Sequence, residues 1–344
     1  MTAFDTEQSD SADAVEIISQ DCGAVVIGRN EGDRLRQCLN SLIKQVTAIV
    51  YVDSGSTDSS VKMAESLGVL VVSLDMTVPF TAARARNAGA AKLLKIYPDL
   101  QFIQFIDGDC ELRSGWIQAA ASFLGEHPDY AVVCGRRRER NPQNSIYNLL
   151  CDMEWDTPIG DASACGGDAL IRTSAYQIVN GYRDDLIAGE EPEMCLRMRE
   201  KGWKINRIDA EMTLHDAAMT RFGQWWKRAQ RAGYAYAEGF SIHGRSLEKY
   251  RQKEIRSILV WAVCLPLSFL CLALISPWML VLFLLYPVQV IRLSVRYRLR
   301  ITSAKQAFWY ALSNVGGKFP QLTGIWRYVL NRIKGRRGTL IEYK

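Results

Sequence analysis

The sequence lacks paired cysteines. Nine cysteines are scattered along its 344 residues, and no two of them form a Cys-x-x-Cys motif. Several of them lie inside apolar runs. We therefore expect reduced cysteines, as in cytosolic proteins, and no disulfide framework.

Two further absences narrow the class of protein. The sequence contains neither the Walker motif nor the dinucleotide-binding motif, both of which hold phosphate with glycine-rich loops. The first 20 residues are polar and acidic, and no secretory signal peptide is visible in them. We expect residues 1–21 to form a disordered acidic N-terminus.

Charge of one sign is not in large excess, because the formal net charge is only +5. The distribution is uneven, however. The N-terminal segment is acidic, and the chain is strongly basic from Arg245 onward. This basic part brackets the most hydrophobic segment, which favours membrane lipids over nucleic acid as a partner.

One short stretch, residues 102–109, carries the clearest candidate chemistry. A largely apolar run of aromatic and β-branched residues ends in Asp107-Gly108-Asp109, and such a run predicts a buried strand. Open α/β sheets bind ligands at the carboxyl ends of their strands. Two carboxylates this close repel each other unless a cation lies beside them, so a hard divalent ion that also contacts phosphate is expected. A solvated Asp-Gly turn is the alternative.

The order of apolar and amphipathic segments predicts an α/β fold. Strands are expected at residues 23–28, 48–52, 69–74 and 102–107, with helices at 33–45, near 61–67 and from 82 onward. This alternation predicts a parallel sheet with right-handed crossovers. Polar or acidic turns follow three of the strands, at Asn30, Asp53 and Asp107, and should meet at one edge of the sheet.

Several short motifs occur in a fixed order along the first two thirds of the chain. They are Gly28-Arg29-Asn30-Glu31, Asp53-Ser54-Gly55-Ser56-Thr57-Asp58, Ala85-Arg86-Asn87-Ala88-Gly89, Asp107-Gly108-Asp109 and the segments 165–172 and 189–197. Together they resemble the family 2 glycosyltransferases. The resemblance covers residues 23–238 and implies the GT-A fold and a nucleotide-diphosphate sugar as donor. We therefore expect a GT-A catalytic domain at residues 22–240.

The resemblance implies roles for matched residues on the donor side. Asn30, Glu31 and Asp53 lie where the family holds the nucleotide base and ribose, and carboxylates suit hydrogen bonds from those groups. Arg86 is a candidate for contact with the diphosphate or with the Asp107 carboxylate.

The same resemblance implies a metal site. Asp109 corresponds to the residue that binds Mg²⁺ or Mn²⁺, and Asp107 to one that contacts the ribose or the water shell of the metal. His215 is a candidate third ligand, with a structural role as the alternative. Gly167 and Asp168 are expected to form a wall of the donor or acceptor pocket, where glycine permits close approach of the backbone.

The acid pair Glu190-Glu191 matches the position of the family's catalytic base. The base removes a proton from the acceptor hydroxyl as that hydroxyl attacks the anomeric carbon opposite the diphosphate, so the configuration inverts. The second residue of the pair is the usual base, which points to Glu191, where the family more often has Asp. Glu190 stays open as the base, and acids placed at a helix N-terminus for electrostatic reasons are the alternative.

Residues 258–275 and 278–291 are almost wholly apolar, and Ser276-Pro277 separates them. Each segment approaches the roughly 17–25 residues that a spanning helix needs. Basic residues crowd both outer flanks, so both ends should face the cytoplasm. We expect a hairpin within residues 241–300, either spanning or re-entrant, with a soluble core helix pair as the alternative.

Residues 301–344 mix aromatic and basic side chains, which predicts interfacial helices and a basic tail.

The resemblance and the apolar hairpin together imply an inverting, metal-dependent glycosyltransferase at the inner (cytoplasmic) membrane, with its catalytic domain facing the cytoplasm. The expected donor is a UDP-sugar, and the expected acceptor is a lipid-linked saccharide of bacterial surface polysaccharide or glycolipid synthesis. The rivals are a polyprenyl-phosphate sugar transferase and a catalytically silent membrane scaffold with the same fold.

Overall fold

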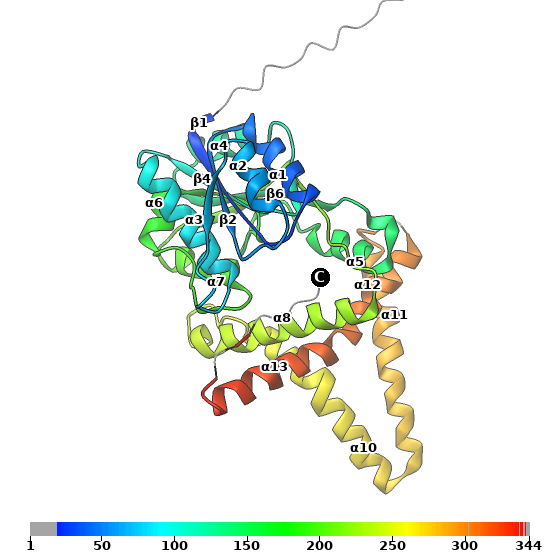
Figure 1. The fold of residues 1–344 in the computed structure, drawn as a ribbon. Helices are drawn as coiled ribbons and strands as arrows, with labels where there is room; N and C mark the ends of the chain where they lie inside the picture. The colour runs from blue at the N-terminus through cyan, green and yellow to red at the C-terminus, as the bar shows by residue number, and fades with distance from the viewer. Residues whose placement is uncertain (1–18, 302, 337, 340, 342–344) are drawn as a thin grey trace, which may run out of the picture.

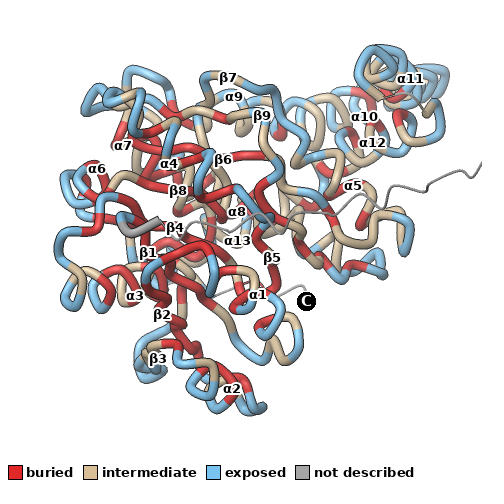
Figure 2. Tube along the Cα trace, turned by 90° about the horizontal axis from the view of Figure 1, so that it is seen from above, coloured by how far each residue is buried: buried red, intermediate tan, exposed pale blue. Residues whose placement is uncertain are grey.

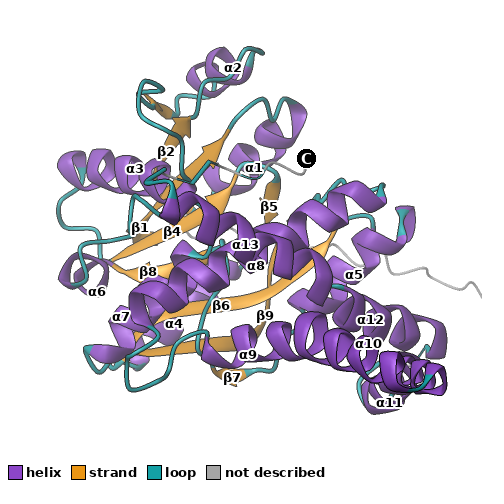
Figure 3. Cartoon of the chain, turned by 90° about the horizontal axis from the view of Figure 1, so that it is seen from below, coloured by secondary structure: helices purple, strands orange, loops and turns teal. Residues whose placement is uncertain are grey.

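The computed structural model describes residues 19–301, 303–336, 338–339 and 341. The predicted disordered segment is residues 1–21, of which 1–18 lie outside the described residues; for residues 19–21 the prediction is wrong, because the first strand begins at Ser19. Nine strands of the described chain form one sheet, in the order β3-β2-β1-β4-β8-β6-β9-β5, with β7 on β9 (Figures 1 and 3). Their bounds are β1 Ser19–Gly28, β2 Val46–Asp53, β3 Leu70–Ser73, β4 Phe102–Asp107, β5 Cys110–Leu112, β6 Tyr130–Glu139, β7 Gly160–Asp161, β8 Ala169–Arg172 and β9 Lys204–His215.

The first four strands confirm the predicted parallel arrangement. β1 pairs in parallel with both β2 and β4, and β3 pairs in parallel with β2. Gly28 lies in register with Asp53, and Ile27 lies in register with Asp107. The three strand ends therefore meet at one edge, as predicted. Beyond β4 the sheet is mixed, because β8 runs antiparallel to both β4 and β6.

Seven helices within the described residues pack on the strands of this sheet. They are α1 Asp33–Ile43, α2 Ser60–Ser66, α3 Ala82–Ile96, α4 Trp116–Glu126, α5 Ile146–Trp155, α6 Thr173–Ile178 and α7 Glu190–Glu200, with a 3-10 turn at Pro142–Asn144. The next helix, α8 Phe222–His243, packs mainly against a helix of the C-terminal region. On α1, Leu35 and Leu39 are buried, whereas Ile43 at the last position is 39% exposed.

Gly89 sets how closely α3 approaches the sheet. A Cβ atom there would lie 2.4 Å from Val25 Cγ1 and 2.9 Å from Val52 Cγ2, which are closer than side-chain atoms can pack. Glycine therefore lets α3 lie directly on β1 and β2. Arg86 is on the same helix and is 3% exposed, so this close packing carries its guanidinium to the edge of the sheet.

A helical hairpin projects from the body of the molecule (Figure 1). Its first arm comprises α9 Gln252–Leu259, the π-helical turn Val260–Cys264 and α10 Leu265–Ile275, and its second arm comprises the 3-10 segment Pro277–Leu284 and α11 Leu285–Tyr297. By length and composition both arms, Gln252–Ile275 and Pro277–Tyr297, could cross a membrane. Only 17% and 6% of the residues in their most apolar windows are buried, so the two arms do not form part of a core within the described chain (Figure 2).

Two further helices, α12 Ala304–Gly316 and α13 Lys318–Ile333, follow the hairpin. α13 lies alongside α8, and together they separate the sheet from the hairpin (Figures 1 and 3). A Cβ atom at Gly233 of α8 would lie 2.0 Å from the Gln321 carbonyl oxygen, and one at Gly324 of α13 would lie 2.0 Å from the Gln230 carbonyl oxygen. The two helices therefore touch backbone to backbone.

Candidate active site

Arg86 joins the end of β4 to the start of α7. Its Nη2 atom lies 2.8 Å from Asp107 Oδ1, and its Nη1 atom lies 2.6 Å from Glu190 Oε1. The side chain of Asp107 is 30% exposed, whereas those of Arg86 and Glu190 are 3% and 7% exposed. A buried guanidinium needs such partners, and the predicted contact between Arg86 and Asp107 is confirmed.

The pKa values of the two acids at the start of α7 shift in opposite directions. Burial alone would raise the pKa of Glu190, but the charges of Arg86 and Arg231 hold it below its ordinary value. Burial raises the pKa of Glu191 to about 7, and the neighbouring charge of Glu190 adds to that effect. The environments of the two carboxyl groups therefore push their pKa values apart, a pattern typical of acid and base pairs in enzymes.

A second ion pair, between Asp168 and Arg137, lies beside the end of β4. Asp168 is fully buried and accepts hydrogen bonds from Arg137 Nε at 2.9 Å, Thr213 Oγ1 at 2.8 Å and the Asp107 amide at 3.2 Å. Burial would raise the pKa of Asp168, but the Arg137 charge and hydrogen bond hold it below its usual range. The backbone segment that carries Asp168 also approaches closely, because a Cβ atom at Gly167 would lie 3.1 Å from Asp107 Oδ2.

Asp109, Cys110 and His215 form a compact cluster whose potential ligand atoms all lie within 4.8 Å of one another. Strand pairing creates it, because Cys110 of β5 lies opposite His215 of β9. His215 Nε2 lies 3.5 Å from Asp109 Oδ1, and His215 Nδ1 lies 3.9 Å from Glu139 Oε2. The Trp155 ring packs edge-on against the imidazole at 4.7 Å. The histidine is thus held between two carboxylates.

The loops after β1 and β2 are bonded to each other. The Asn30 carbonyl oxygen Oδ1 accepts the amide of Thr57 at 2.7 Å, and the Asp53 carboxylate accepts the amides of Gly55 and Ser56 at 3.0 and 2.9 Å. Asn30 adopts a positive φ of 55° to make this contact. These side chains therefore fix the shape of the predicted nucleotide loop.

Two other residues of these loops have local roles. Glu31 forms an ion pair with Arg34 at 2.7 Å on the first turn of α1. Asp58 accepts the Ser60 amide at 2.9 Å just before α2, whose N-cap is Ser59. Asp58 is therefore a turn residue that precedes the helix.

Two family models match the chain. "Glycosyl transferase family 2" matches residues 24–176, and "Glycosyl transferase family group 2" matches residues 102–295, which is more than half of the chain. The chain belongs to the family 2 glycosyltransferases. The predicted family is therefore confirmed, and both matches include the strand that ends in Asp107.

Individual relatives of this family 2 glycosyltransferase are distant. The "Pre-mycofactocin glycosyltransferase" of Mycobacterium tuberculosis is 26% identical over 227 residues, which are 61% of this chain and 45% of that protein. The "O-antigen chain rhamnosyltransferase RfbN" of Salmonella typhimurium is 26% identical over 182 residues, 47% of this chain and 56% of that protein. The chain thus spans about half the length of these relatives.

One solved structure supports the GT-A fold of this family member over nearly its full length. The "Mannosyltransferase PcManGT from Pyrobaculum calidifontis in complex with GDP-Man and Mn2+" aligns with 91% of this chain and 88% of its own, with a TM-score of 0.57 at 13% identity. The predicted α/β fold class is confirmed.

Sequence reasoning missed three residues of this site: Arg137, Glu139 and Trp155. The first two lie on one face at the end of β6, where a charged run follows buried residues. That charged run was a usable signal for a strand end at the site. Trp155 is the last residue of α5 and carries no signal of its own.

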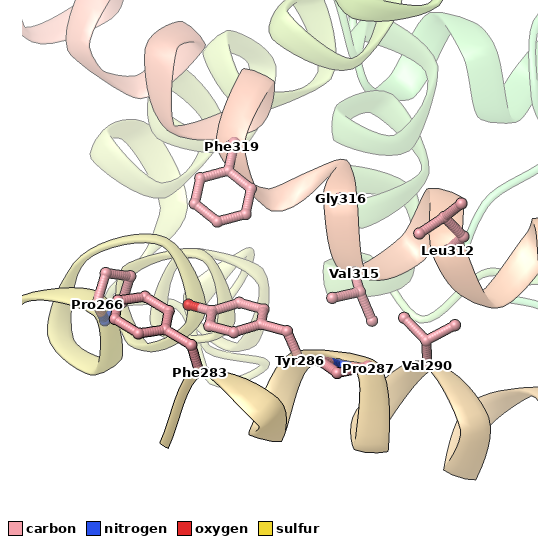
Figure 4. A pocket seen from close by; sticks show the side chains of 9 residues that line it. All are labelled: Pro266, Phe283, Tyr286, Pro287, Val290, Leu312, Val315, Gly316 and Phe319. Carbon is pink, nitrogen blue, oxygen red and sulfur yellow. The ribbon is translucent and has the colours of Figure 1, made fainter. Parts of the chain in front are cut away.

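Two cavities lie away from the sheet edge, among the C-terminal helices. The larger, about 520 Å³, is apolar, and Figure 4 shows its side chains facing one another from α10, the 3-10 segment, α11, α12 and α13. Phe283, Tyr286 and Phe319 are its aromatic residues. The acids at the sheet edge and this apolar cavity therefore belong to different parts of the molecule.

Proposed function

We propose that the protein is an inverting, metal-dependent glycosyltransferase that moves a sugar from a nucleotide-diphosphate sugar to a lipid-linked saccharide. The observation that carries the proposal is the convergence of Asp107, Asp109 and the Arg86–Glu190 pair at one edge of a GT-A sheet. Structural aspartates scattered over a fold would not meet in this way.

The residues at the edge fit a divalent cation. Asp109 and His215 supply a carboxylate and an imidazole, and both are buried and close together. The His215 Nδ1 atom is buried and forms no hydrogen bond among the described residues, and Glu139 Oε2 lies 3.9 Å from it. Carboxylate oxygens suit Mg²⁺ and Mn²⁺, whereas the Cys110 thiol is a soft ligand. When bound, such an ion stabilises the charge that develops on the leaving diphosphate.

Glu191 is the proposed base. Its raised pKa places it near neutrality, where a carboxylate both accepts a proton readily and is ionised often enough to act. It takes the proton of the acceptor hydroxyl, the oxygen bonds to the anomeric carbon, and the nucleotide diphosphate departs from the opposite face. Glu190 is engaged with Arg86 and serves as a positioning residue.

Asn30, Glu31 and Asp53 are proposed to line the nucleotide site. Asn30 and Asp53 hold the loop backbone rigidly, and a preorganised loop loses little entropy when base and ribose bind. The exposed part of Asp107 and the close approach of the backbone at Gly167 support a site for the ribose and diphosphate beside Arg86. We propose UDP as the nucleotide.

The acceptor is proposed to be a lipid-linked saccharide at the cytoplasmic face of the inner membrane. The hairpin supports this location, because both of its arms expose apolar side chains and are long enough to span a bilayer. A relative named as an O-antigen chain rhamnosyltransferase supports a surface polysaccharide as the product. The apolar cavity between the hairpin and α12–α13 favours one rival in particular, a transferase that uses polyprenyl phosphate itself as acceptor.

The test uses the purified full chain in detergent with UDP-, GDP- and dTDP-sugars, in Mg²⁺, Mn²⁺ or chelator. We expect metal-dependent release of nucleoside diphosphate with one donor, and a lipid extract that gains the mass of one sugar. Product formed on polyprenyl phosphate without a primed saccharide would establish the rival. No release with any donor would establish a silent scaffold.

A further inference from the structure

A second cavity lies where the first arm of the hairpin begins, beside α9. It has a volume of about 480 Å³, and three of its lining residues are cations: Lys249, Lys253 and Arg256. All three are exposed. Three positive charges around one hollow require either an anion or solvent to offset their mutual repulsion.

The acids close to this cavity are paired with other arginines. The nearest acid in the cavity wall, Glu248, is bonded to Arg199 at 2.6 Å, and Glu254 on α9 is bonded to Arg251 at 3.0 Å. Within the described chain, no carboxylate forms an ion pair with any of the three cations. The three cations of the cavity are therefore unpaired within the described chain, and the acid in its wall, Glu248, is engaged with Arg199.

The cavity also changes character along the helix. One turn beyond Arg256, or about 6 Å along the axis, its wall becomes apolar at Val260 and Trp261. Val260 is 43% exposed. Ser257 adds a hydroxyl between the charged and apolar parts. A soluble anion would leave the apolar end in water, whereas an amphiphile with a charged head satisfies both ends.

The position in the fold agrees with an amphiphile. α9 is the first part of the candidate span Gln252–Ile275, and α10 continues it (Figure 3). The three cations therefore lie at the start of that arm, at the depth of lipid headgroups if the arm enters a bilayer. Trp261 follows the cations along the same arm, toward its apolar part. Indole rings favour the membrane–water interface.

We propose that this cavity binds the phosphate of an anionic lipid. The Lys249 and Lys253 ammonium groups and the Arg256 guanidinium bond the phosphate oxygens, and the hydrocarbon chain follows Val260 into the membrane. Either a membrane phospholipid or a lipid phosphate intermediate supplies this chemistry. The proposal does not depend on the transferase activity.

The test is native mass spectrometry of the purified full chain, titrated separately with phosphatidylglycerol, undecaprenyl phosphate, phosphatidylcholine and inorganic phosphate. The variant Lys249→Gln/Lys253→Gln/Arg256→Gln removes the three cations. We expect it to weaken binding of at least one anionic lipid roughly 100-fold, from the loss of three interfacial charges. Arg256→Lys, which keeps the charge, should retain most of the binding.

The matched control removes three arginines from the other flank of the hairpin, by Arg292→Gln/Arg296→Gln/Arg300→Gln, and should leave lipid binding unchanged. A loss confined to undecaprenyl phosphate identifies the lipid intermediate as the ligand, and an equal loss for both anionic lipids identifies a general headgroup site. Equal losses in both triple variants, or inorganic phosphate bound as tightly as either lipid, would overturn the proposal. Because no donor sugar is present, failure here leaves the proposed transferase function untouched.

Discussion

The sheet edge and the C-terminal hairpin arrange polar and apolar groups in opposite ways. At the edge, charged side chains are buried and paired, as Arg86 and Asp168 show at 3% and 0% exposure. On the hairpin, large apolar side chains such as Leu274 and Trp278 are 89% and 84% exposed. The first region holds charges away from water, and the second exposes apolar side chains over two arms long enough to cross a membrane.

This contrast explains why one chain can contain both regions. Buried charges are tolerated only with partners, because removing a partner leaves an ion without solvation. Exposed apolar surface of this extent is unfavourable in water and favourable in a bilayer. The close helix crossing of α8 and α13 at Gly233 and Gly324 joins the two regions, so their relative placement depends on backbone contact.

The largest expected effect concerns the charge at the edge. Asp109→Ala should abolish metal-dependent release of nucleoside diphosphate, at least about 1000-fold, because the proposed ion loses its carboxylate ligand. Turnover with the preferred donor is measured across a Mn²⁺ titration. Asp129→Ala, which removes an exposed aspartate paired with Lys204, is the control and should keep full activity. Unchanged turnover in Asp109→Ala would remove that residue from the site.

The next effect separates the two acids of α7. Glu191→Gln should lower kcat about 100- to 10000-fold while donor affinity is retained, because only proton removal from the acceptor is lost. Measuring transfer and donor binding side by side for Glu191→Gln and Glu190→Gln decides the assignment. Transfer stopped by Glu190→Gln with donor binding intact would mean that Glu190 is the base.

The pH profile provides an independent check on the same carboxylate. Burial raises the pKa of Glu191 to about 7, and the base must be ionised to act, so kcat should fall as the pH drops through about 7. The pKa of Glu191 is higher in the folded protein than in the unfolded chain. The free energy of unfolding therefore falls as the pH rises from the unfolded-state pKa to about 7, where Glu191 ionises in the native protein. Glu191→Gln should therefore raise the thermal stability at pH 8 and much less at pH 5.

The buried ion pair between Asp168 and Arg137 tests how much charge pairing at the edge contributes to stability. Asp168→Asn should lower the free energy of unfolding by about 3–5 kcal/mol, because Arg137 would stay buried beside a neutral group. Chemical unfolding of both proteins gives the difference. Asp129→Asn, at an exposed ion pair, should show no measurable change, and a similar loss in both variants would mean that burial is not the cause.

The sequence predicted the parts of the site that depend on local pattern. The ends of β1, β2 and β4 could be placed together because parallel strands present their carboxyl ends at one edge, and the Arg86–Asp107 contact followed from a family motif. The partners of Asp168 and His215 could not be predicted. Arg137 and Glu139 lie on β6, which meets β8 and β9 only through tertiary pairing that no local periodicity encodes.

The hairpin half of the comparison is tested by placing a charge on its exposed face. Leu267 is 56% exposed, and Leu267→Lys should cost about 2.5–3.5 kcal/mol of membrane insertion if that arm spans the bilayer. The fraction of protein kept in membranes after an alkaline wash reports the effect. Leu247→Lys, at a fully exposed leucine before the hairpin, should retain the membrane-bound fraction. Equal retention of both variants would show that the arm is not in lipid.

The smallest effect concerns the joint between the two regions. Gly233→Ala places a methyl group 2.0 Å from the Gln321 carbonyl, so α8 and α13 must separate, at a cost of about 1–3 kcal/mol. Gly223→Ala lies on the same helix with nothing within 4 Å of its Cβ atom, and alanine is the better helix former there. Thermal unfolding should therefore shift down for Gly233→Ala and stay level or rise for Gly223→Ala. If both variants unfold at the wild-type temperature, backbone contact does not hold the hairpin region to the catalytic domain.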